Sequence, residues 1–147
     1  MDIQEQEQLM QILKQREAFL AKAQRLSHAG SFGWRASAGE MIWSEEALRI
    51  LEFDRTAIPT LEPLLHRVHP EDATFVKQTI ECVLHGAKEF DLECRLQMPN
   101  GSVKYVHMVA HAERDESGEL DFVGSVMDIT ASKDAEYRIR RIINTFQ

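Results

Sequence analysis

The spacing of apolar residues changes along the chain, and each change predicts a different element. Residues 3–28 contain no Gly or Pro, and their apolar positions advance by three and four residues. These positions are Leu9, Ile12, Phe19, Ala23 and Leu26, with Arg16 in the one gap. The pattern predicts an amphipathic helix with an a/d seam of about three heptads. It fits equally a helix that lies on its own domain and a coiled coil with a second chain.

The chain then becomes extended. Gly30 is predicted to end the first helix, and a hairpin is expected to pair Phe32–Ser37 with Glu40–Trp43. Ser44, followed by two glutamates, predicts the start of a short helix. A serine hydroxyl can cap free N–H groups there, and acidic side chains suit the positive end of a helix.

Two further helical segments are expected before the period changes again. "LEPLLHRV" predicts a brief helical turn, and "HPEDATFVKQTIECVLHG" opens with Pro70 and two acids and closes at Gly86. The apolar side chains of the second segment share one helical face and predict a core helix; they are Phe75, Val76, Thr79, Ile80, Val83 and Leu84.

From Glu89 the apolar residues alternate with polar ones, which predicts a strand with one buried face. Pro99-Asn100-Gly101 predicts a tight turn. The next strand, Ser102–Arg114, has apolar residues at both parities and is therefore expected to be covered on both faces and nearly central. "DESGEL" predicts another turn, and "DFVGSVMDI" the last strand.

The tail returns to helical spacing at Ala135, Ile139, Ile142 and Phe146. Because the pattern is still running at the last residue, we expect a helix that continues toward a further domain. The predicted architecture is an α+β domain with one antiparallel sheet. Its segments are an amphipathic helix at 1–28, the domain at 29–130 and a linker helix at 131–147.

The composition excludes several classes of protein. The chain has 147 residues with 17 basic and 24 acidic side chains, a net charge of −7, which argues against a nucleic-acid surface. No apolar run approaches the ~20 residues needed to span a bilayer, and the acidic N-terminus is not a secretory signal. We therefore expect a cytoplasmic segment without membrane contact, in which Cys82 and Cys94 are reduced, buried residues.

No motif for an enzyme is present. The chain contains no HExxH, GxSxG or Gly-rich phosphate loop. In "HPED", Pro70 follows His69 directly and the acids begin a helix, so capping explains this segment without a metal. A small stand-alone enzyme is the weakest hypothesis, and no metal site is predicted.

The segments "HPED", "ECRLQMPNGSVKYV", "DESGEL" and "VGSVMDIT", in this order, resemble the PAS sensory-domain family over residues 28–130. The resemblance implies a five-stranded antiparallel sheet in strand order 2-1-5-4-3, with short helices around a cavity. It also implies a sensory or relay module within larger bacterial proteins, commonly sensor histidine kinases and diguanylate cyclases. The alternative is a ligand-free domain for dimerisation or interaction.

The resemblance does not extend to two cofactor-binding branches of that family. Flavin-binding light sensors carry a reactive Cys in an Asn-Cys-Arg-Phe motif, whereas Cys82 lies in "IECVL" and Cys94 in a predicted strand. The histidines lie near helix ends or on a strand, and none is placed clearly as an axial ligand. Neither haem nor flavin is expected, although an unknown small-molecule ligand remains open.

Three sets of site residues are predicted. Apolar side chains that would line the cavity or fill it are Trp34, Met41, Trp43, Phe75, Cys82, Phe90, Cys94, Met108 and Met127. The first helix and the tail are expected to form a homodimer. The third set is a relay at the end of the last strand.

For that relay, counting from the "DESGEL" turn places Asp128 near Val106, with Lys104 diagonal to Asp128 on the same face, within reach of an ion pair. Thr130 is expected to cap the following helix. The plain interpretation is a helix cap with a surface ion pair worth less than ~1 kcal/mol. In the resembling family this Asp-Ile-Thr motif is linked to signal relay, which favours a functional role.

Overall fold

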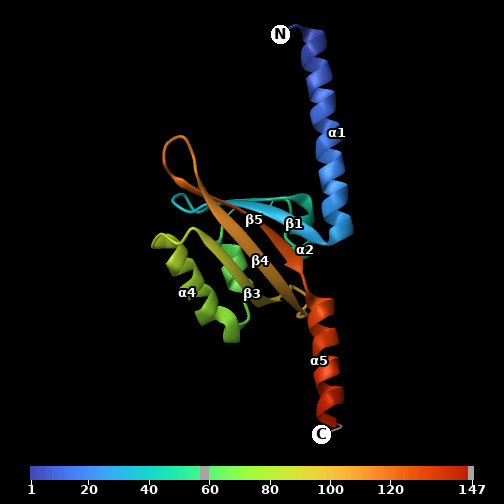
Figure 1. Cartoon of the computed structure of the whole chain (residues 1–147), viewed down its shortest axis with the longest axis vertical. Helices are drawn as coiled ribbons and strands as arrows, with labels where there is room; N and C mark the ends of the chain where they lie inside the picture. Colours follow the sequence, from blue (N-terminus) through green and yellow to red (C-terminus); the bar gives the residue numbers. More distant parts are fainter. Residues whose placement is uncertain (57–59, 146–147) are drawn as a thin grey trace.

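The computed structural model describes residues 1–56 and 60–145. A five-stranded antiparallel sheet carries short helices on one face, and a long helix projects from each end of the domain (Figure 1). The strands are β1 (Ala29–Arg35), β2 (Glu40–Trp43), β3 (Glu89–Gln97), β4 (Val103–Arg114) and β5 (Leu120–Asp128). The helices are α1 (Ile3–Ser27), α2 (Glu45–Leu51), α3 (Glu62–Arg67), the 3-10 turn η1 (Pro70–Asp72), α4 (Ala73–Leu84) and α5 (Thr130–Thr145).

The strand order is β2-β1-β5-β4-β3, which confirms the predicted order and the α+β class. The first and last strands are neighbours, and Ala29 pairs with Met127. The predicted register of β4 and β5 is also confirmed, because Val106 pairs with Asp128. The two ends of the domain therefore lie side by side, because the start of β1 is next to the end of β5. Helix α1 ends and helix α5 begins there.

Only one face of the sheet is covered by helices. On β4, Val106, Met108 and Ala110 are buried, whereas Val103 on the opposite face is 39% exposed. The prediction that this strand is covered on both faces is therefore wrong, although β4 is an inner strand as expected. Apolar side chains also remain exposed on the outer face of β5, where Val123 is 55% exposed.

The end of α1 differs from the prediction. His28, not Gly30, terminates the helix in a left-handed conformation with φ of 55°, and its N–H donates to the carbonyls of Arg25 and Gln24. Gly30 is buried in β1 instead. A Cβ atom there would lie 2.4 Å from the backbone nitrogen of Ala47, so this glycine lets α2 pack directly on the strand.

Local capping explains how the short helices begin. The Ser44 hydroxyl accepts a hydrogen bond from the N–H of Ala47 at 3.2 Å, as predicted for the start of α2. The same hydroxyl accepts from the N–H of Ser31 at 2.9 Å and so ties α2 to β1. At the next helix start, His69 Nδ1 accepts from the N–H of Glu71 at 3.1 Å, the structural role predicted for that histidine.

Helix α4 buries a narrower face than predicted. Val76 and Val83 point into the core, but Phe75 is 51% exposed and Leu84 is 58% exposed. The six apolar residues of this helix span more than the stripe that contacts the sheet. Within the described residues, no helix is long and apolar enough to cross a membrane.

Candidate functional site

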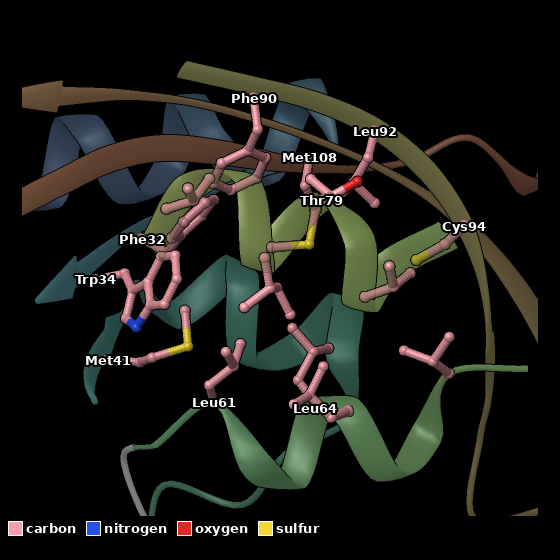
Figure 2. Close-up of a pocket in the computed structure, with 15 residues that line it drawn as sticks. Phe32, Trp34, Met41, Leu61, Leu64, Thr79, Phe90, Leu92, Cys94 and Met108 are labelled. Atoms are coloured by element: carbon pink, nitrogen blue, oxygen red, sulfur yellow. The ribbon is translucent and has the colours of Figure 1, made fainter. Parts of the chain in front are cut away.

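A small apolar cavity lies between the sheet and the helices α3 and α4 (Figure 2). Its volume is about 40 Å³, and no polar atom of the lining residues is exposed to it. Pockets for drug-sized ligands measure roughly 300–1,000 Å³, so the cavity accommodates only a very small molecule in this conformation.

The structure places five of the nine predicted lining residues at this cavity. They are Trp34, Met41, Phe90, Cys94 and Met108, all from the inner face of the sheet. They share this face because side chains two apart along a strand point to the same side.

The other four predicted lining residues do not line the cavity. Trp43 packs between Phe32 and Phe53, with ring centroids 5.6 and 6.3 Å away. Phe75 and Cys82 lie on the exposed side of α4. Met127 lies on the outer face of the sheet and is 39% exposed. The predictions for Phe75, Cys82 and Met127 are wrong because these side chains project away from the covered face.

Helix α3 supplies lining residues that the prediction missed. Leu61, Leu64, Leu65 and Val68 line the cavity from the side opposite the sheet. Their spacing of three, one and three residues is that of one helical face, so "LEPLLHRV" did contain the signal. From α4, Thr79 is the only hydroxyl among the lining residues, and it donates to the carbonyl of Phe75 at 3.0 Å.

No ionisable group in its charged form faces the cavity. None of the histidines, all of which the structure describes, is among the lining residues. Burial raises the pKa of the Cys94 thiol to about 12, and the nearby Asp72 carboxylate adds to the shift. The thiol is therefore neutral at physiological pH and is a poor nucleophile or metal ligand. Across the described residues, no group of three or more His, Cys, Asp or Glu side chains is arranged to hold a metal ion.

The two motifs around η1 and β3 form one cluster beside the cavity. Asp72 accepts hydrogen bonds from the backbone N–H of Arg95 at 2.7 Å and from its guanidinium at 2.8 and 3.1 Å. These bonds hold the pKa of the Asp72 carboxyl below its usual range. The cluster fixes the start of α4 on the edge strand β3.

The junction between β5 and α5 is a closed set of hydrogen bonds. The Asp128 carboxylate accepts from the backbone N–H of Thr130 at 3.0 Å and from its hydroxyl at 2.6 Å. The Thr130 hydroxyl accepts from the N–H of Tyr105 at 3.1 Å, and the Tyr105 carbonyl accepts from the N–H of Ile129 at 2.9 Å. Asp128 thus caps the helix, the role predicted for Thr130, while Thr130 joins the helix to β4.

The predicted ion pair between Lys104 and Asp128 is absent among the described contacts. The Lys104 ammonium donates to the carbonyl of Ile50 at 2.8 Å and pairs with Glu52 at 3.0 Å. These acceptors lie at the C-terminal end of α2, where carbonyl groups lack partners within the helix and attract cations. Counting along the strands gave the face of Lys104 correctly but could not locate the end of α2.

A second residue binds the same end of α2. The Arg67 guanidinium donates to the carbonyls of Leu51 and Glu52 and lies over the Phe53 ring, 4.3 Å from its centroid. Arg67 is the last residue of α3, which covers the cavity. Helices α3 and α2 and strand β4 are therefore connected through the end of α2.

Helix α5 has a further attachment that the sequence prediction missed. Lys133 pairs with Glu93 of β3 at 2.8 Å. Glu93, Cys94 and Arg95 are consecutive, so the edge strand contacts α5, the cavity and η1 through three neighbouring side chains. Alternation along the strand predicts that Cys94 points to the opposite face from Glu93 and Arg95. The partner of Glu93 cannot be predicted in this way, because it depends on the path of α5.

The predicted dimer residues of α1 are all exposed. Leu9 and Ile12 are 45% and 47% exposed, and Phe19 and Leu26 are 72% and 73% exposed; Ala23 is exposed as well. No residue of α1 is buried, and only its C-terminal end touches the domain, where Gln24 donates to Ser31 at 3.2 Å. Leu13 and Leu20 widen the exposed stripe. In the tail, Ile139 and Ile142 are exposed, and Phe146 lies outside the described residues.

The strand order, the helices on one face and the cavity between them define the class of fold. A family model described as "PAS fold" matches residues 40–127. This is more than half of the chain, and the protein therefore belongs to the PAS fold family. No protein with a curated description is detectably similar in sequence.

Solved structures agree with this assignment. A sensory box histidine kinase/response regulator from Burkholderia thailandensis superposes with a TM-score of 0.69 at 22% identity, covering 86% of this chain and 96% of that chain. The N-terminal domain of a diguanylate cyclase with PAS/PAC sensor from Marinobacter aquaeolei gives 0.62 at 22% identity, over 71% and 98%. A PAS domain from Colwellia psychrerythraea gives 0.58 at 20% identity, over 82% and 98%. At these identities the likeness is one of fold.

Proposed function

We propose that this chain is a sensory and signal-relay module of a larger bacterial signalling protein, a sensor histidine kinase or a diguanylate cyclase. It perceives a small molecule or a partner and passes the signal to an output domain through its terminal helices. The chain itself is not an enzyme under this proposal, and kinase or cyclase activity belongs to a domain outside it. The matches to domains of such proteins support the class of function.

One observation carries the proposal. The two strands that hold α5 also line the cavity: β4 holds it through Tyr105 and lines the cavity with Met108, and β3 does so through Glu93 and Cys94. A change in the cavity that displaces either strand therefore changes the anchoring of α5. A signal needs only a few kcal/mol of differential binding to shift such an equilibrium.

The test is a fusion of residues 1–147, in helical phase, to the output domain of a histidine kinase. Asp128→Ala and Thr130→Ala are expected to change or lock kinase activity while thermal stability stays close to that of the unmodified fusion. Asp134→Ala, which removes an exposed carboxylate of α5, is the matched control. Unchanged activity in both junction variants would contradict the relay and leave Asp128 as an ordinary helix cap.

The proposal includes neither haem nor flavin. The small apolar cavity, with no histidine among its lining residues, supports this part of it. The purified protein is expected to be colourless; a Soret band or flavin absorbance near one equivalent per chain would refute the expectation.

The second candidate function is a ligand-free domain for dimerisation, located in the cytoplasm like the first. The exposed apolar stripe of α1 and the small size of the cavity favour it. Detection by mass spectrometry of a stoichiometric small molecule released from the purified protein would exclude this second candidate.

A further inference from the structure

The cavity offers a ligand no hydrogen-bond partner. The Thr79 hydroxyl donates within α4, and no polar atom of the lining residues is exposed to the cavity. The Trp34 indole nitrogen is buried without a partner among the described residues, yet it does not open onto the cavity, whose exposed surface is entirely apolar. Figure 2 shows this nitrogen on the Met41 side of the ring.

The size of the cavity would allow a bound water, but its lining argues against one. Its volume of about 40 Å³ exceeds the roughly 10–15 Å³ that a cavity needs to hold one water. A buried water requires two to four polar partners, as a rough rule, and this surface supplies none. Protein interiors contain few voids larger than a water molecule, so this space is an unusual feature of the core.

The walls can adapt to an occupant. Met41 of β2 and Met108 of β4 both line the cavity, and their unbranched side chains repack readily. The α3 side is formed by leucines on a helix of six residues whose N-cap has no side-chain hydrogen bond. Modest expansion of the cavity therefore needs no change in the strands' hydrogen bonding.

We propose that the cavity binds an uncharged molecule without any hydrogen-bonding group, of the size of a dissolved apolar gas or a short hydrocarbon. This inference rests on the proposed sensory function and specifies the ligand class of its site. Recognition is by shape and by exclusion: a ligand with a hydroxyl, carbonyl or charge loses its hydration on entry and gains no partner in return.

The experiment compares propane, dimethyl ether and ethanol, which have equal numbers of heavy atoms but differ in hydrogen-bonding groups. Each is titrated into residues 1–147 while methyl and indole resonances are recorded by NMR. Propane is expected to shift the signals of Leu64, Val83 and Met108. For only three heavy atoms the dissociation constant is no lower than about 0.5 mM. Ethanol is expected to bind about tenfold more weakly or worse.

Matched variants connect the signal to the cavity. Val83→Ile adds one methyl group to the lining and is expected to weaken propane binding several-fold, whereas Ile80→Val removes one and preserves or strengthens it. Val103→Ile makes the same addition as Val83→Ile on the outer face of β4 and is expected to leave binding unchanged. Thermal unfolding of each variant shows that it is folded.

Two results would overturn the ligand class. One is the absence of propane binding to a folded protein, which would make the cavity a packing void. The other is tighter binding of dimethyl ether than of propane with a shift of the Trp34 indole N–H, which would make that group the recognition element. If the kinase fusion still responds to Asp128→Ala, either result leaves the relay intact. Conversely, propane could bind the fusion without changing its kinase activity. That result would show that the cavity is not the sensing site, while the proposed class of ligand would stand.

Discussion

Gly30 and Gly33 lie three residues apart on β1, but only Gly33 has room for a methyl group. A Cβ atom at Gly30 would lie 2.4 Å from a backbone atom of Ala47, whereas the nearest atom to a Cβ at Gly33 is 3.9 Å away. Gly30→Ala is therefore expected to lower the free energy of unfolding by at least about 2 kcal/mol. Gly33→Ala, the control, is expected to change it by no more than about 0.5 kcal/mol.

Urea unfolding monitored by circular dichroism measures both variants. Equal stability of the two would show that α2 can move away from β1 at no cost. The direct packing of α2 on β1, inferred from Gly30, would then be wrong.

Asp72 makes stability depend on pH. Because Arg95 holds the pKa of Asp72 below its unfolded value of about 4, the pair contributes stability above that pH. This contribution is lost as the pH falls through the lower, folded-state pKa. Asp72→Asn is expected to cost about 1–2 kcal/mol at pH 7, and the difference from the unmodified protein should shrink below about pH 4.

Denaturant unfolding at several pH values between neutral and acidic measures this difference. Glu71→Gln is the control, since Glu71 also bonds Arg95 but its side chain is 72% exposed. A difference that grows on acidification would have the wrong sign and would exclude the depressed pKa.

At the scale of single residues, the sequence predicts what strand geometry determines. Alternation along β3 predicted that Phe90 and Cys94 share one face, and counting from the turn predicted the register of Val106 and Asp128. It could not give the partner of Lys104, because that depends on where a separate helix ends in space. Rotation of a helix about its axis is likewise weakly specified when apolar residues cover much of its surface, which is why Phe75 and Cys82 were assigned to the wrong side of α4.

At the scale of elements, α5 is held by two independent attachments of different strength. The junction at Asp128 and Thr130 involves backbone groups, whereas Lys133 and Glu93 form an ion pair in which Glu93 is 48% exposed. Loss of a helix cap costs about 1 kcal/mol, and an exposed ion pair contributes less. The junction should therefore control local opening of the helix.

Amide hydrogen exchange can measure this difference. Asp128→Ala is expected to speed exchange at Thr130 and Tyr105 about fivefold, the factor that corresponds to the lost cap. Glu93→Gln is expected to have a smaller effect, and Glu89→Gln, on the same strand, none on α5. Equal acceleration in all three variants would indicate a general loss of stability rather than a specific junction.

The sequence anticipated the elements better than their attachments. The helix starts at Ser44 and Pro70 and the turns at Asn100-Gly101 and in "DESGEL" depend on local chemistry, and all are observed. The predicted end of α1 is wrong because Gly30 was taken as the residue that ends the helix. From the sequence alone, a glycine required for close packing cannot be distinguished from a glycine that ends a helix.

At the scale of the whole molecule, the apolar stripe of α1 is a surface that the domain leaves uncovered. Leu9→Asp with Phe19→Asp is expected to dissociate a dimer that is present at micromolar concentration, because each substitution places a charge in the a/d seam. Gln11→Asp with Ala18→Asp adds the same charge outside the seam, at two positions one heptad apart, and should leave the dimer intact. Sedimentation velocity measures both. An unmodified protein that stays monomeric at high concentration would exclude the dimer.

The two ends of the domain lie side by side on the neighbouring strands β1 and β5, and this has a consequence for how the domain could be removed. Helices α1 and α5 project to opposite sides of the domain, and the chain runs in the same direction through both (Figure 1). If residues 28–129 are excised and Ser27 is joined to Thr130, Ala135 falls one heptad after Leu26, and Ile142 one heptad after that. Ser132 likewise falls one heptad after Ala23, and Ile139 one heptad after Ser132, so Ile139 has the same heptad position as Leu9 and Ala23.

The excised chain thus keeps a single heptad phase from end to end, as if the whole folded domain were a cassette inserted into one helix. We expect the joined peptide to be more helical by circular dichroism than a peptide that lacks Thr130 as well, in which the apolar seam is offset by one residue, about 100° around the helix.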